Sequence, residues 1–288
     1  MNISCQFATS LRSAEHIATA EAMDYKRAWL FDTPAQSPDV WAMLALAAQQ
    51  TRRIGLGPGV LVPTLRHPMV NASGAAMLSA LAPGRVAAAF GTGFNGTRAL
   101  GAPPATWSYL KSYVHTFRAL LRGETVEWDR RPIRMLHPAD HAPARPIELP
   151  VLISALGPKR LAIAREIADG LFSDATYEFG GDVTQLPGGQ HWLKVINAQP
   201  EHERHLAVHD QHLVGLNQAD DAAWAAGSWQ AIPAPTVTGS PARSAEQLAH
   251  YTDQGITEII YQPAGPDITG ELERFITIAQ QTKQTVQS

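Results

Sequence analysis

The first 93 residues contain four short apolar stretches separated by three segments with helical spacing. This periodicity predicts strands at residues 3–8, 28–32, 54–60 and 85–90, with helices at residues 13–23, 39–50 and 69–80 between them. A helix between successive strands favours parallel pairing, because the chain must cross back before the next strand begins. We therefore expect an α/β fold whose functional face is built at the C-terminal ends of the strands.

A fifth strand–helix unit contains a turn that is suited to a phosphate group. Residues 151–153 form an apolar strand, and residues 154–159 (SALGPK) form the turn that opens the next helix. Gly157 lacks a Cβ, Pro158 suits the first helical turn, and the free amides of a helix N-terminus attract anions. Lys159 adds a positive charge. An ordinary turn without a ligand explains the same residues equally well.

Other predicted strands also end in polar residues or glycine. Asp32 follows the second strand, Gly59 and Val60 end the third, and residues 91–93 (Gly-Thr-Gly) follow the fourth. Glycine at such a position lets the backbone approach a ligand closely. A carboxylate at a strand end of a barrel is more often functional than not, although it also caps turns. These strand ends are therefore candidate ligand contacts.

The overall charge makes some partners implausible. A net charge of −3 and a pI near 6.4 provide no positive field for nucleic acid. Only 17% of the 288 residues are charged, which is few for a surface in contact with water. We therefore expect part of the surface to be a subunit interface of a homo-oligomer, such as a homodimer.

The sequence shows no sign of export or of membrane insertion. Cys5 is the one cysteine, so an internal disulfide is excluded, and the first residues (MNISCQFATS) do not resemble a signal peptide. No apolar stretch has the length of a membrane span. We expect a cytoplasmic protein.

A histidine cluster at residues 202–212 raises the question of a metal site. His205, His209 and His212 have spacings of four and three residues, which would place them on one face of a helix. The segment lacks a recognised ligand motif, such as a glutamate between paired histidines. Polar contacts at the surface are the preferred interpretation, and no metal is predicted.

Seven strands can be counted along the chain. Beyond the fifth strand, residues 171–173 and 258–261 form the remaining two, and aromatic residues of a helix at 107–122 are assigned to the core. Because an open sheet leaves backbone groups unpaired at its edges, a barrel with seven strands is incomplete.

Eight short motifs occur in order along the chain. They are RIGLG at 53–57 with Val60, RHP at 66–68, LAPGR at 81–85, GTG at 91–93, ALLRG at 119–123, ALGPK at 155–159, ADG at 168–170 and VTGSP at 237–241. In their order and spacing they resemble the bacterial-luciferase-like family of flavin-dependent and deazaflavin-dependent oxidoreductases, over about the first 173 residues and again from near residue 237.

The resemblance implies more chain between Ser173 and Tyr177 than the sequence has. The family normally has a seventh strand and much of another helix there, whereas this sequence passes almost directly from one residue to the other. We infer that a segment near Asp174 is absent from the sequence.

The resemblance implies one luciferase-like (β/α)8 TIM-barrel domain over residues 1–288, with a flavin at the C-terminal face. It implies a cis peptide between Gly59 and Val60 against the ring system, and apolar walls that include Trp29 and Phe94. Arg66, Lys159 and Arg160 would serve an acidic cofactor tail. The expected cofactor-binding residues are Phe7, Asp32, Gly59, Val60, Gly91, Thr92, Gly93, Ser154, Ala155, Gly157, Pro158 and Lys159.

One departure from the family affects the expected chemistry. The sugar-phosphate dehydrogenase branch has a histidine after the second-strand acid and a glutamate after the fourth-strand glycines, where this chain has Thr33 and Phe94. The acid/base pair of that branch is therefore missing, and no catalytic residue is assigned.

Three functional hypotheses remain. The first is an oxidoreductase or monooxygenase that uses reduced FMN on a small organic substrate; its variant is a deazaflavin (F420) reductase or dehydrogenase. In both cases the cofactor supplies the chemistry while the protein positions it. The second is a flavin-binding protein without activity. The third, a metal-dependent hydrolase, rests on the histidine cluster alone.

Overall fold

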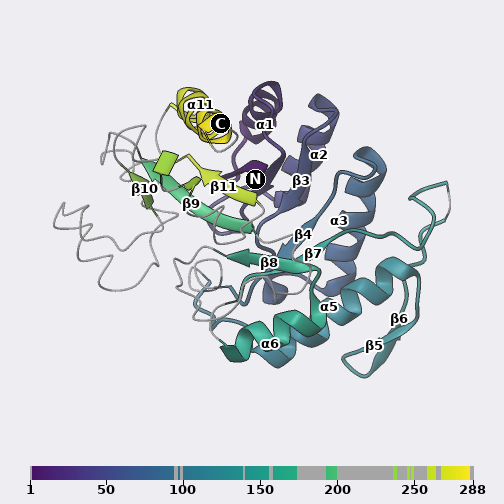
Figure 1. Ribbon diagram of the computed structural model, residues 1–288. Helices are drawn as coiled ribbons and strands as arrows, with labels where there is room; N and C mark the ends of the chain where they lie inside the picture. Colours follow the sequence, from purple (N-terminus) through teal and green to yellow (C-terminus); the bar gives the residue numbers. More distant parts are fainter. Residues whose placement is uncertain are drawn as a thin grey trace.

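The computed structural model describes residues 2–93, 97, 100–138, 140–155, 158–173, 193–199, 236–238, 245–246, 248–249, 258–263 and 267–285. Parallel strands form its centre, and helices cover them on the outside (Figure 1). None of the helices within these ranges is long and apolar enough to cross a bilayer.

Eight parallel strands form a closed ring. In spatial order they are β1 (Asn2–Phe7), β2 (Arg27–Leu30), β3 (Gly55–Pro58), β4 (Ala88–Phe90), β7 (Val151–Ile153), β8 (Gly170–Ser173), β9 (Leu193–Gln199) and β11 (Glu258–Gln262), which pairs with β1. Parallel bridges from Leu56 to Val86 and from Leu61 to Phe90 join β3 to the β4 side and close the ring. The predicted TIM barrel is thus confirmed.

The eighth position in the ring corrects the sequence-based count of seven strands. β9 lies between β8 and β11. Its residue Leu193 pairs with Phe172 of β8 on one side and with Glu258 of β11 on the other. Its sequence, LKVINAQ, mixes Lys194 and Asn197 with apolar residues, so it lacks the continuous apolar run of the other strands. The ring needs no further strand, and the reason for inferring an absent segment near Asp174 is removed. Residues 174–192 lie outside the described ranges.

Five helices follow strands where the sequence predicted them: α1 (Ser13–Ala22), α2 (Val40–Gln50), α3 (Pro68–Leu81), α5 (Trp107–Arg122) and α6 (Pro158–Ile167). The helix α11 (Ile268–Thr285), which follows β11, was not predicted, and a 3-10 turn spans Pro63–Leu65. Asp39 caps α2 by accepting from the amides of Trp41 and Ala42, at 3.0 and 3.1 Å. Gly123 ends α5 with φ +82°, a conformation that glycine adopts without steric cost.

Two additions lie outside the ring. β5 (Val126–Trp128) and β6 (Arg131–Ile133) form an antiparallel hairpin after α5. β10 (Thr236–Thr238) pairs in parallel with the end of β9. The Trp128 ring of the hairpin packs near the Tyr109 and Tyr113 rings of α5, with ring centroids 5.6 and 5.7 Å apart.

The strands separate two apolar layers. The outer layer, between strands and helices, holds the side chains of Ile3, Cys5 and Phe7 together with most of the buried helix residues. The inner layer fills the barrel with six fully or almost fully buried side chains: Trp29, Ala87, Ala89, Leu152, Phe172 and Ile260. Gly57 on β3 leaves room for the Trp29 indole, since a Cβ there would lie 2.7 Å from Trp29 Cζ3. The barrel interior is therefore packed and is not a channel.

Candidate functional site

The C-terminal ends of the strands gather the predicted site residues at one rim of the barrel. Asp32 follows β2, Gly59 and Val60 follow β3, Gly91 follows β4 and Ser154 follows β7. β2, β3, β4 and β7 are consecutive neighbours in the ring, with β1 on one side of them and β8 on the other. Parallel strands bring their carboxyl ends to the same side, which explains why residues far apart in sequence meet here.

Val60 and Ser154 both lie close to Gly91 on this rim. A Cβ placed on Gly91 would lie 2.9 Å from Val60 Cγ2 and 3.6 Å from Ser154 Cβ. Gly91 is buried, whereas Val60 and Ser154 remain partly exposed. The missing side chain at Gly91 therefore provides the room that Val60 occupies.

The Gly59–Val60 peptide is cis, as the family resemblance implied. The side-chain amide of Gln6 on β1 donates a hydrogen bond to the Gly59 carbonyl oxygen of this peptide and so holds that carbonyl group in place. A Cβ on Gly59 would lie 2.9 Å from the Phe172 ring and 3.2 Å from Trp29 Cβ. Trp29 and Phe172 meet edge to face at 5.1 Å and form an apolar floor beneath this peptide.

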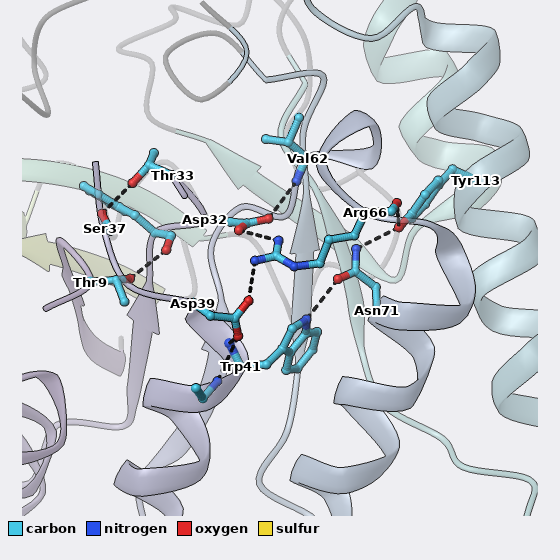
Figure 2. Close-up of polar contacts among 12 residues, drawn as sticks. Thr9, Asp32, Thr33, Ser37, Asp39, Trp41, Val62, Arg66, Asn71 and Tyr113 are labelled. Carbon is cyan, nitrogen blue, oxygen red and sulfur yellow. Dashed lines mark hydrogen bonds and ion pairs between the residues drawn. The ribbon is translucent and has the colours of Figure 1, made fainter. Parts of the chain in front are cut away.

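Asp32 is held by an arginine from the segment that follows β3. Arg66 Nη1 donates to Asp32 Oδ1 at 2.6 Å, and Arg66 Nη2 donates to Asp39 Oδ2 at 2.7 Å (Figure 2). The Asp32 side chain is 1% exposed and that of Arg66 is 11% exposed. One guanidinium therefore bridges two carboxylates at the edge of the site.

Burial and the arginine act in opposite directions on these acids. Burial raises the pKa of Asp32 above its ordinary value, and the neighbouring Arg66 only partly offsets this. For Asp39, which is half exposed, hydrogen bonds from Arg66 and from the Ala42 amide outweigh burial and leave its pKa lowered. Asp32 is consequently the carboxylate at this rim that is harder to ionise.

A second set of polar contacts supports the arginine from outside. Tyr113 donates its hydroxyl hydrogen to the Arg66 carbonyl at 2.8 Å, and Asn71 Nδ2 donates to the Tyr113 oxygen at 2.7 Å. The Trp41 indole N–H donates to Asn71 Oδ1 at 2.9 Å. Figure 2 shows these side chains leaning together from α2, α3 and α5. The sequence assigned Tyr113 to the core, and its ring is fully buried.

Phe7 is the predicted site residue that the structure places elsewhere. Its ring packs outward against His16 of α1, with centroids 5.8 Å apart, and belongs to the layer between strands and helices. Side chains alternate across a strand, so the polar residues Ser4 and Gln6 occupy the inner face of β1 instead. Gln6, which the sequence analysis did not select, contacts the Gly59 carbonyl in its place.

The loop after β4 holds the other two residues of the Gly-Thr-Gly motif. Thr92 is partly exposed and its carbonyl accepts from the Ala105 amide at 2.8 Å. Gly93 has φ +78°, and a Cβ there would lie 2.5 Å from Val62 Cγ1. A positive φ and the close contact both require glycine at this position. Phe94 lies outside the described residues.

The predicted phosphate turn is described only in part. Ala155 is buried after β7, and Lys159 and Arg160 are exposed at the start of α6. The Arg160 guanidinium lies 5.9 Å from the ring centre of Trp107 on α5, within the range of a cation–π contact. Gly157 and the side chain of Pro158 lie outside what the structure describes, so their role in binding stays a prediction.

Two other sequence observations can be placed. Thr33, at the position of the family branch's histidine, shares a hydrogen bond of 2.7 Å with Ser37 in the turn after Asp32. Within the described ranges, no three histidine, cysteine or acidic side chains are grouped as a metal site. The histidines at 202–212 fall outside those ranges.

Comparison with known proteins agrees with the family resemblance. The sequence profile of the luciferase-like monooxygenase family matches residues 9–183, which is more than half of the chain. A 5,10-methylenetetrahydromethanopterin reductase of Methanolobus tindarius is 27% identical over 237 residues, covering 80% of this chain and 69% of that protein. An F420-dependent glucose-6-phosphate dehydrogenase of Beutenbergia cavernae is 26% identical over 291 residues, covering 88% and 84%.

Solved structures share the fold at low sequence identity. The coenzyme F420 dependent tetrahydromethanopterin reductase from Methanopyrus kandleri has a TM-score of 0.72 at 19% identity, with 96% of this chain and 98% of that chain covered. The oxygenating constituent of 3,6-diketocamphane monooxygenase from Pseudomonas putida, in complex with FMN, has a TM-score of 0.67 at 12% identity, with 96% and 95% covered. Both support the barrel architecture.

Proposed function

Because this chain belongs to the luciferase-like monooxygenase family, we propose that it is an oxidoreductase that transfers a hydride between F420 and a small organic substrate. The observation that carries this proposal is the match to an F420-dependent dehydrogenase along 84% of that protein and 88% of this chain. The sequence analysis preferred FMN and placed the deazaflavin second; the curated relatives reverse that order.

The rim has features that suit a flat ring system. Gly91 lacks a side chain where a Cβ would collide with Val60, and Val60 presents a partly exposed apolar surface above Trp29 and Phe172. Trp29 Nε1 is a buried donor without a hydrogen-bond partner among the described atoms. Asp32 adds a carboxylate acceptor beside this surface. An apolar surface with a few oriented polar groups is typical of a cofactor site.

Each group of residues would have a separate task. When bound, the deazaflavin accepts or donates the hydride, and the protein supplies position and polarity. Val60 would support the ring from one side, in the position that the missing side chain of Gly91 allows it to take. Asp32 would accept a hydrogen bond from an N–H or O–H of the ligand. Lys159 and Arg160, exposed on α6, would attract an acidic tail.

A second candidate is a monooxygenase that uses reduced FMN. Thr33 favours it, because the acid/base pair of the sugar-phosphate branch is missing and the Thr33 hydroxyl is engaged with Ser37. One protein of similar fold is a monooxygenase component in complex with FMN, so this barrel architecture is compatible with oxygen chemistry. A dry apolar pocket would then be required around the ring.

Cofactor titration separates these candidates. The purified protein is titrated with F420 and with FMN, each oxidised and reduced, and the dissociation constant is measured by fluorescence. We expect F420 to bind at least about tenfold more tightly than FMN, equivalent to about 1.4 kcal/mol. Tighter binding of FMN, followed by oxygen consumption with a substrate panel, would favour the monooxygenase. Cofactor binding without turnover on any donor or acceptor would favour a non-catalytic flavin-binding protein.

We also propose that the enzyme is a cytoplasmic homodimer that contacts its partner through α2 and α3. These helices pack against each other and contain no Asp, Glu, Lys or Arg. Their outer faces expose Leu46, Val70 and Met77, at 50%, 52% and 40%. An exposed apolar face formed by two adjacent helices is a common site of protein association.

A further inference from the structure

The contacts around Arg66 form a closed circuit. Asp39 accepts from the backbone amide of Trp41 and from the Arg66 side chain. The Arg66 backbone accepts from Tyr113, which accepts from Asn71, and Asn71 accepts from the indole of Trp41. The circuit thereby returns to the residue where it began (Figure 2). It links the segment after β3 to α2, α3 and α5, so the position of the Arg66 side chain is fixed from several sides.

The positive charge of Arg66 is fully compensated by the carboxylates of Asp32 and Asp39. Its two terminal nitrogens each contact a carboxylate, at 2.6 and 2.7 Å, so one positive charge faces two negative charges. An arginine in that position has no remaining charge for an anionic ligand. This corrects the expectation that Arg66 binds the acidic tail of a cofactor, which leaves Lys159 and Arg160 for that task.

The two oxygens of Asp32 differ in their contacts. Oδ1 receives the short hydrogen bond from Arg66, whereas the contact of Oδ2 among the described residues is a long one, 3.5 Å from the Val62 amide. A carboxylate oxygen has two acceptor directions, so Oδ2 retains capacity for a further donor. The charged and titratable groups that face Asp32 in the described part of the chain are Arg66, Asp39 and Tyr113.

We propose that Arg66 is a positioning residue: it holds the buried Asp32 carboxylate ionised and oriented through Oδ1, so that Oδ2 keeps acceptor capacity for a hydrogen-bond donor of the ligand. This inference rests on the proposed function for the identity of the ligand, and on the described contacts for the tether itself. A carboxylate buried to this degree stays charged only when a paired cation compensates for its lost hydration.

The first test uses the ligand-free protein labelled with carboxyl-13C aspartate. The Asp32 resonance is identified by its loss in Asp32→Asn, and its chemical shift is followed with pH by NMR. We expect Arg66→Met to raise the titration midpoint of Asp32 by about 1 to 3 pH units. Arg66→Lys should restore most of the midpoint, because the charge is kept. Asp39→Asn, which retains the helix cap, should not raise it.

The second test measures the dissociation constants of F420 and FMN for the same variants. Arg66→Lys should weaken binding of the preferred cofactor about tenfold, since a single ammonium group cannot bridge two carboxylates in the planar geometry of arginine. Asp32→Asn should weaken binding, and adding Arg66→Lys to it should cause little further loss. Additive losses would contradict the tether.

The two tests distinguish failure of this inference from failure of the proposed function. An Asp32 titration midpoint that is unchanged in Arg66→Met would overturn the positioning role, even if F420 binds tightly. The same conclusion follows if Arg66→Lys leaves both the Asp32 midpoint and the cofactor dissociation constant unchanged. A raised midpoint in a protein that binds neither F420 nor FMN would uphold the tether and reject the cofactor assignment. If Arg66→Met does not fold, the Lys variant and the double variant decide the result.

Discussion

Gly91 and Val60 are in direct contact across the join between β3 and β4, since a Cβ on Gly91 would lie 2.9 Å from Val60 Cγ2. Real Cβ atoms do not approach other side chains so closely, so Gly91→Ala must displace Val60. We predict that this variant binds the preferred cofactor at least about tenfold more weakly, as judged by fluorescence titration. Affinity is lost because Val60, which is partly exposed at the rim, would be displaced from the surface proposed to support the cofactor.

Gly84→Ala is the control for Gly91→Ala. Gly84 has φ +70° and nothing within 4 Å of its built Cβ, so alanine there strains the backbone without filling space. We expect this variant to lower the melting temperature and to leave cofactor affinity unchanged. Equal loss of affinity in both variants would mean that reduced stability, not the position of Val60, explains the effect.

Lys159 and Arg160 lie at the start of α6, exposed beside the predicted phosphate turn. Replacing both with alanine should weaken F420 binding more than FMN binding, since the acidic tail of the deazaflavin offers more negative charge than one phosphate. The difference should shrink as salt is added, because exposed charges are screened. Arg165→Ala, in the last turn of the same helix, is the matched control and should have little effect. Equal losses for both cofactors would remove these residues as contacts for the tail.

Much of the barrel followed from local pattern, whereas the side-chain network did not. Strands such as residues 151–153 are buried on both faces, and their continuous apolar sequence distinguishes them from the helices. β9 was missed because Lys194 and Asn197 interrupt that pattern. The pairing of Arg66 with Asp32 spans 34 residues and depends on the turn at Pro63–Leu65, so no local signal predicts it.

The orientation of β1 shows a second limit of sequence reasoning. Both faces of this strand are buried, so burial alone does not say which side chains enter the barrel. Phe7 was expected to face the ligand, yet it packs against the helices with Ile3 and Cys5, while Ser4 and Gln6 point inward. The alternation of polar and apolar residues was visible in the sequence; its direction depends on the polar contacts within the ring, to Glu258 and Gly59.

Glu21 fastens the end of α1 to the segment that leads into β3. Its carboxylate accepts from the backbone amides of Arg52, Arg53 and Ile54, at 3.0, 2.6 and 2.8 Å. Burial acts to raise the pKa of Glu21, but the three amides outweigh it and leave the pKa below its ordinary value of 4.5. We predict that Glu21→Gln lowers the free energy of unfolding at pH 7 by about 1 to 3 kcal/mol.

The effect of Glu21 should depend on pH in a defined direction. A carboxyl whose pKa is lowered by folding stabilises the protein above its unfolded pKa, and that stabilisation is lost as the pH falls through the folded pKa. The difference between wild type and Glu21→Gln in urea unfolding should therefore shrink below pH 4.5. Glu15→Gln, which removes an exposed ion pair with Arg12, should change stability by less than about 1 kcal/mol. A Glu21 effect that does not vary with pH would contradict the charged contact.

The uncharged faces of α2 and α3 supply the last prediction. If two copies meet there, wild-type protein should have a solution mass of twice the 31.1 kDa chain by light scattering. Val70→Glu should then raise the dimer dissociation constant at least about tenfold, because the carboxylate would be buried without a partner. Leu11→Glu is the control: Leu11 is 81% exposed but precedes α1, so the dimer should persist. A monomeric wild type, or dissociation caused equally by both substitutions, would remove α2 and α3 as the interface.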